Sequence, residues 1–273
     1  MSAPPPLRLL ASVRDAREAL LALSLGADII DLKEPAAGAL GAVPPEEQLR
    51  VLAALGSRRP QVSATVGDLP LEAGASLAAA IAATAARGVD IVKFGVFGGG
   101  AAAMAALDAL DRHLQDAAVS VLLVPVLLAD RLRDARELER LAVRALGLHG
   151  VAGVMLDTAG KVGIDASARR LTQIFTAAQL QRFVAVVQAA GGFAGLAGAL
   201  RADDIALAAG SGADLLGFRS ALCAGGRNGA LDQAAFARVR LQVRAANARR
   251  KAAALPSKIS VVATCGAAAA NSG

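Results

Sequence analysis

Short apolar runs alternate with longer amphipathic segments along almost the whole chain. The apolar runs have the length and the aliphatic content of buried strands, and Gly, Pro or Asp residues bound them. They predict strands at residues 7–13, 29–33, 61–66, 91–94, 119–127, 153–156, 193–197 and 215–219. The segments between them carry apolar residues at helical spacing and predict helices at residues 14–20, 46–55, 76–87, 101–114, 133–148, 167–190, 202–209 and 232–254. We expect the helix at 167–190 to be interrupted.

This regular strand–helix alternation favours one architecture. In a chain of 273 residues it predicts an α/β protein with a single (β/α)8 TIM-barrel domain over residues 1–254. The alternative is an open doubly wound sheet, which usually has fewer strands and a glycine-rich nucleotide loop after the first one. The glycine run at 98–100 follows the fourth predicted strand and lacks that spacing. Residues 255–273 are typical of a disordered tail.

The composition changes this picture only in detail. The chain is 55% hydrophobic, with 28 Gly residues and no Trp or Tyr, so we expect a core of Ala, Leu and Val. Cys223 and Cys265 lie far apart and form no metal-type spacing, which disfavours a disulfide framework. No signal-peptide pattern is visible, and glycines break the uncharged run at 183–200. These features predict a cytoplasmic protein with no membrane partner.

The charge is positive but does not indicate nucleic-acid binding. The net charge is +6, and many of the arginines lie in the last predicted helix. Stacking aromatics and a recognition module are missing there, so we interpret these arginines as the solvated face of a helix. A positive field would also attract small anionic substrates. The oligomeric state stays open, and a homo-oligomer is compatible with the sequence.

Acidic and lysine side chains lie at the ends of three predicted strands. Asp31 and Lys33 are two residues apart, so both point to the same side at the end of the second strand. Lys93 ends the fourth strand, Asp157 ends the sixth, and Lys161 follows four residues later. Barrel enzymes place their sites at the carboxyl ends of the strands. A single charge there is usually a solvated loop residue or a helix cap, but five from three strands predict one shared pocket.

Clustered lysines at a barrel mouth point to covalent chemistry. Only a neutral amine attacks a carbonyl, and crowding with desolvation lowers the pKa of a lysine. Asp31 and Asp157 would position the amines and transfer protons. His113 and His149 lie in or just after predicted helices and are more typical of surface or core positions. Since no His, Asp or Glu cluster has metal spacing, we expect neither a metal nor a cofactor.

The loops after the last two strands predict a phosphate site. Gly198 follows the seventh strand, and Arg219 and Ser220 follow the eighth. In many barrels these loops hold a phosphate through backbone amides, and an arginine adds a charged donor. Together with the amines, they indicate a phosphorylated carbonyl substrate.

Four ordered motifs, at residues 27–35, 38–42, 62–68 and 156–161, resemble one family. They are similar to the (5-formylfuran-3-yl)methyl phosphate synthases of methanofuran biosynthesis, also called 4-(hydroxymethyl)-2-furancarboxaldehyde-phosphate synthases. The likeness runs from about residue 7 to 243. Where the family tends to have Arg-Gly and then Cys-Lys-Gly-Gly, this chain has Arg219-Ser220 and Cys223-Ala224-Gly225-Gly226.

The resemblance implies a TIM-barrel lyase that condenses two glyceraldehyde 3-phosphate molecules into a furan aldehyde phosphate, with loss of phosphate and water. It implies that Lys33 forms the Schiff base and that Lys93 is the proton acceptor. Asp31, Asp157 and Lys161 match further polar positions of the family's site. A different class I aldolase, a phosphosugar isomerase and a non-catalytic barrel that binds phosphometabolites remain alternatives.

Overall fold

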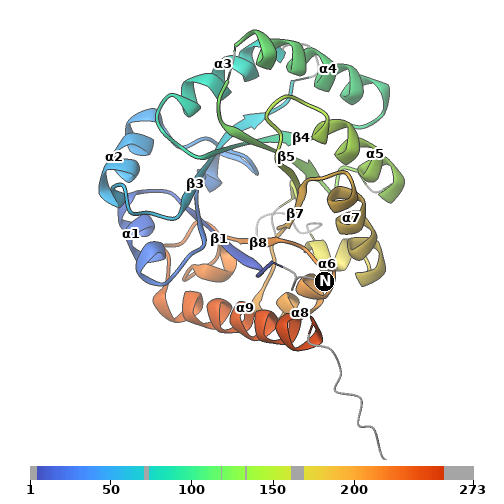
Figure 1. Ribbon diagram of the computed structural model, residues 1–273. Helices are drawn as coiled ribbons and strands as arrows, with labels where there is room; N and C mark the ends of the chain where they lie inside the picture. The colour runs from blue at the N-terminus through green and yellow to red at the C-terminus, as the bar shows by residue number, and fades with distance from the viewer. Residues whose placement is uncertain (1–4, 71–73, 118, 133, 161–168, 255–273) are drawn as a thin grey trace, which may run out of the picture.

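The structure, a computed structural model, describes residues 5–70, 74–117, 119–132, 134–160 and 169–254. Parallel strands form a closed barrel in chain order, and helices surround it as an outer ring (Figure 1). The strands are β1 (Arg8–Val13), β2 (Ile29–Leu32), β3 (Gln61–Asp68), β4 (Ile91–Val96), β5 (Leu122–Leu128), β6 (Gly153–Asp157), β7 (Phe193–Leu196) and β8 (Leu215–Phe218). Because β8 pairs with β1, the sheet is closed, and the (β/α)8 prediction is confirmed over the open-sheet alternative.

Each predicted helix is present within a few residues of its expected bounds. The α-helices are α1 (Ala16–Ser24), α2 (Pro45–Leu55), α3 (Gly74–Ala85), α4 (Gly100–Asp116), α5 (Ala135–Leu146), α6 (Leu171–Ile174), α7 (Ala177–Ala189), α8 (Ile205–Gly210) and α9 (Gln233–Ala254). Three 3-10 turns are η1 (Pro35–Ala37), η2 (Ala202–Asp204) and η3 (Ser220–Leu222). The predicted interruption falls at extended Phe175, after which Thr176 caps α7 through a hydrogen bond from Gln179 N. The predicted tail at 255–273 lies outside the described residues.

Alternation along the strands divides the core into two layers. On β4, Val92 and Phe94 point outward and pack under the helices, whereas Ile91 belongs to the cluster inside the barrel. The inner cluster contains Leu10, Ile29, Leu40, Ile91, Val124, Val126, Leu128, Met155 and Leu215. A Cβ on Gly195 would lie 2.6 Å from the Met155 Cγ, so the narrow interior requires glycine there. The apolar layer fills the lower barrel and leaves polar positions to its carboxyl end.

The last helix joins the first strand and fixes the closure of the barrel. Leu7 N donates to Asn247 Oδ1 at 2.7 Å, and Asn247 Nδ2 donates back to Leu7 O at 2.9 Å. Arg240 on the same helix pairs with Asp28 at 2.6 Å, and Asp28 also accepts from Leu9 N. None of the described helices is long and apolar enough to span a bilayer.

Candidate active site

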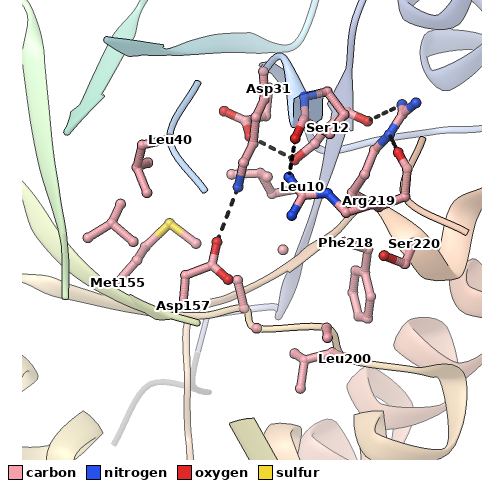
Figure 2. Close-up of a pocket in the computed structure, with 18 of the residues that line it drawn as sticks. Leu10, Ser12, Asp31, Leu40, Met155, Asp157, Leu200, Phe218, Arg219 and Ser220 are labelled. Carbon is pink, nitrogen blue, oxygen red and sulfur yellow. Dashed lines mark hydrogen bonds and ion pairs between the residues drawn. The ribbon is translucent and has the colours of Figure 1, made fainter. Parts of the chain in front are cut away.

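Two lysine–carboxylate pairs lie in one pocket at the carboxyl end of the barrel. Lys93 Nζ is 2.7 Å from Asp31 Oδ1, and Lys33 Nζ is 3.2 Å from Asp157 Oδ2. All four side chains are buried and line the same central pocket. Figure 2 shows Asp31 and Asp157 entering this pocket from opposite sides. The structure thus brings together four of the five charged residues that the sequence predicted, and Lys161 lies outside the described residues.

Strand register explains how Asp31 is held. Its neighbours across the parallel ladder are Ser12 on β1 and Ser63 on β3. Ser12 Oγ donates to Asp31 Oδ2 at 2.8 Å, and Ser63 Oγ donates to Oδ1 at 2.6 Å. The carboxylate is 0% exposed, and these bonds with Lys93 replace its lost hydration.

The two serines were missed in the analysis of the sequence. Each is a small polar residue inside an otherwise apolar strand and stands on the inward face by strand alternation. A buried hydroxyl needs a hydrogen-bond partner, so this pattern could have indicated that each serine contacts another polar group. That this group is Asp31 could be assigned only from the register of the paired strands.

The surroundings of Lys93 change its pKa. Burial lowers the pKa of Lys93 below its usual value of 10.5; the charge of Asp31 opposes this shift, and the charge of Lys33 adds to it. A lysine with a lowered pKa is neutral more often and can then accept a proton. This environment suits a general base rather than a permanently charged anchor.

Asp157 is placed by a loop that is itself anchored. Its Oδ1 accepts from the Thr158 backbone N–H at 2.7 Å, while Oδ2 faces Lys33. The following residues, Ala159 and Gly160, both donate backbone N–H groups to Asp130 at 2.7 Å. Asp130 therefore fixes the direction in which the chain leaves β6.

The central pocket is small and adjoins a wider cavity. Its volume around the lysines is about 50 Å³, with Leu10, Leu40 and Met155 among its apolar walls (Figure 2). A second cavity of about 570 Å³ adjoins it and shares Ala199, Leu200, Ser220 and Arg227 with it. The inner space suits the reacting end of a substrate, and the outer cavity has the size of a typical small-molecule site.

The predicted phosphate-binding residues all line the central pocket, but their roles differ. Gly198 has φ +100°, and a Cβ there would lie 3.0 Å from the Thr158 Cγ2, so this turn requires glycine. Ser220 begins η3, and Arg219 alone separates it from β8. Phosphate binding by these turns stays a prediction.

Arg219 lines the same pocket, but the protein already uses its donors. Its guanidinium pairs with buried Glu18 at 2.5 Å and donates to the backbone carbonyls of Ser12, Arg227 and Gly229. Burial alone would raise the pKa of Glu18, but its hydrogen bonds from Arg219 and Arg14 and their charges lower it below 4.5. The predicted contact of Arg219 with phosphate would require breaking these bonds, so the structure gives Arg219 a role in holding the β8–α9 loop.

Sequence reasoning also missed Arg227 in that loop. It is buried, lines both cavities and follows two glycines with positive φ.

Among the described residues, no group of three or more His, Cys, Asp or Glu side chains has an arrangement suited to a metal ion.

Comparison with known proteins now adds to this geometry. A sequence model described as 4-HFC-P synthase matches residues 9–240. The chain belongs to this family. A protein of Methylorubrum extorquens whose name places it in the same family is 41% identical over 233 residues, which cover 84% of this chain and 89% of the relative. The (5-formylfuran-3-yl)methyl phosphate synthase of Methanopyrus kandleri is 34% identical over 219 residues, or 79% of this chain and 89% of the relative.

Solved structures agree on the architecture of this chain. The phosphoribosyl anthranilate isomerase of Thermus thermophilus superposes with a TM-score of 0.56 at 12% identity, covering 88% of this chain and 99% of the isomerase. A likeness at that identity supports the barrel fold alone. The relatives are named as synthases, which supports an enzyme.

Proposed function

We propose that this family member condenses two glyceraldehyde 3-phosphate molecules into (5-formylfuran-3-yl)methyl phosphate, with loss of phosphate and water. The observation that carries the proposal is the pair of lysine–carboxylate contacts, Lys33 with Asp157 and Lys93 with Asp31, in one buried pocket. A structural ion pair needs only one lysine and one acid. Two pairs side by side at the catalytic face of a barrel suit chemistry that uses one amine as nucleophile and the other as base.

Lys33 is the proposed nucleophile. Its Nζ, when neutral, adds to the aldehyde carbon, and water leaves to form an imine. The Asp157 carboxylate, 3.2 Å from the Nζ, is placed to accept and return the protons of these steps. Lys161, four residues after Asp157 in the sequence, is proposed to assist these steps.

Lys93 is the proposed proton acceptor. An imine acidifies the adjacent carbon, and a neutral Lys93 Nζ can remove that proton. The electron pair left on carbon then expels phosphate from the neighbouring carbon, which breaks its C–O bond. Asp31, held by two serines, keeps Lys93 oriented and stabilises the ammonium that forms. Carbon–carbon bond formation with the second triose and dehydration complete the furan, so the activity is that of a carbon–oxygen lyase.

The narrow inner pocket and the wider outer cavity fit a reaction of two substrates. One triose reacts at Lys33, and the second approaches from the outer cavity. As the family resemblance implies, the product would enter methanofuran or analogue biosynthesis, and we place the reaction in the cytoplasm. Neither a metal nor a cofactor is required by the proposed steps.

The test combines trapping with product analysis. Wild-type protein is incubated with glyceraldehyde 3-phosphate, reduced with borohydride and mapped by peptide mass spectrometry. We expect triose mass on Lys33, release of phosphate and furan absorbance, all lost in Lys33→Ala. Lys251→Ala is the matched control, because Lys251 is exposed on α9. Wild-type protein with unmodified Lys33 and no furan product would defeat the proposal, and an aliphatic sugar phosphate would favour an aldolase.

A further inference from the structure

Arg227 occupies a defined position in the lining of the pocket that holds the lysine pairs. It lies between η3 and α9, and its side chain is turned inward, so that the residue is only 9% exposed. Its Nη2 donates to Pro35 O at 2.8 Å and to Gly38 O at 3.1 Å. These carbonyls belong to the loop that follows Lys33. Two hydrogen bonds thus fix one end of the guanidinium at the mouth of the central pocket.

The Nε of the same guanidinium is fully buried and makes no hydrogen bond. Both hydrogen bonds of the guanidinium to described residues are made by Nη2. No described carboxylate lies within ion-pair distance of Arg227 either, whereas the neighbouring Arg219 is paired with Glu18. A buried charge that lacks an anion is destabilising, so natural proteins pair it or use it to bind a ligand.

The location of this charge matches what a phosphorylated substrate needs. Arg227 lines both the central pocket and the outer cavity, together with Ala199 and Ser220 from the β7 and β8 loops. Lys33 and Asp157 are already paired with each other in the same pocket. Arg227 is therefore the described cationic side chain of the central pocket that has a buried N–H without a hydrogen bond and no carboxylate within ion-pair distance, and the charges of Asp157 and Glu34 act on it only from farther away.

We infer that Arg227 is an anion-binding residue, which accepts a phosphate group at the junction of the two cavities. Its free N–H groups would donate charge-assisted hydrogen bonds to phosphate oxygens. The assignment of that phosphate to a triose phosphate rests on the proposed function. Binding of the anion itself does not.

Direct titration with inorganic phosphate tests the inference without turnover. Calorimetry or ³¹P NMR on the full chain compares wild type with Arg227→Gln and Arg227→Lys. We expect Arg227→Gln to weaken phosphate binding about 10- to 100-fold. Arg227→Lys keeps the charge but loses the planar fork, and should weaken binding less. Arg249→Gln is the matched control, because Arg249 is exposed on α9 and lines neither cavity.

Kinetics give the second readout. With glyceraldehyde 3-phosphate, Arg227→Gln should raise KM more than it lowers kcat. Unphosphorylated glyceraldehyde has no phosphate to expel, so it reports imine formation alone, and its borohydride trapping on Lys33 should not change. Unaltered phosphate affinity in Arg227→Gln, or an equal loss in Arg249→Gln, would overturn the inference. If Arg227→Gln does not fold, Arg227→Lys decides by the same titration. A protein that binds phosphate through Arg227 but forms no furan would refute the proposed function and leave this inference standing.

Discussion

Replacing Asp31 by Asn removes a charge whose effect can be followed with pH. Asp31→Asn keeps the size of the side chain and a hydrogen-bonding group for Ser12 and Ser63, but it deletes the carboxylate 2.7 Å from the Lys93 Nζ. Breaking a buried ion pair by removing one partner typically destabilises a protein by about 3–5 kcal/mol. Lys93 can reduce this loss by giving up its proton, since burial already lowers its pKa.

The sign of the pH dependence follows from linkage. The charge of Asp31 raises the pKa of Lys93, so the variant lowers this pKa further below the unfolded value of 10.5. Where the unfolded chain binds the proton and the folded one does not, stability rises with pH by up to about 1.4 kcal/mol per pH unit. The loss of stability in Asp31→Asn should therefore be greatest below the pKa that Lys93 has in the variant and shrink as pH rises, until the wild-type Lys93 itself becomes neutral.

Urea denaturation of wild type and variant across this pH range measures the effect. Ser63→Ala is the matched control, because it removes a hydrogen bond from the same carboxylate without changing the charge. We expect it to destabilise the protein by about 1–3 kcal/mol with no slope in pH. A pH-independent loss in Asp31→Asn would show that Lys93 does not respond to Asp31, and the reasoning would fail.

Three further outcomes follow from the structure. Glu18→Gln should destabilise the protein by about 3–5 kcal/mol in urea titrations, because it leaves the buried Arg219 guanidinium without its counter-ion. Gly195→Ala should lower the melting temperature, since its Cβ would stand 2.6 Å from the Met155 Cγ inside the barrel; a wild-type melting temperature would contradict the packing. Burial raises the pKa of the Cys223 thiol to about 11, so iodoacetamide at pH 8 should modify it far more slowly in folded than in urea-unfolded protein, by peptide mass spectrometry.

The sequence predicted the barrel because short apolar runs, typical of buried strands, alternate regularly with segments that carry apolar residues at helical spacing. Asp31, Lys33, Lys93 and Asp157 were found for a related reason. All four follow apolar strand residues, and in a parallel barrel those ends meet on one face. The pairing within the four could not be predicted, because Lys33 contacts Asp157 across the barrel rather than its own neighbour Asp31.

The loop residues were harder to assign. Arg219 and Arg227 are similar in type and only eight positions apart, yet one is neutralised by Glu18 from α1 and the other is not. From the sequence, Glu18 would be assigned to the solvent-exposed face of an amphipathic helix. Its inward position, and therefore the difference between the two arginines, depends on how the loop before α9 packs against that helix.

The contact between Leu7 and Asn247, which spans 240 positions, has a consequence for biosynthesis. β1 is translated first, but both β8 and α9, which complete its surroundings, are translated last. Throughout elongation, the nascent sheet keeps two open edges that could pair with other chains. Protein production should therefore depend on chaperone capacity, and chains truncated before residue 215 should aggregate rather than accumulate as a smaller barrel.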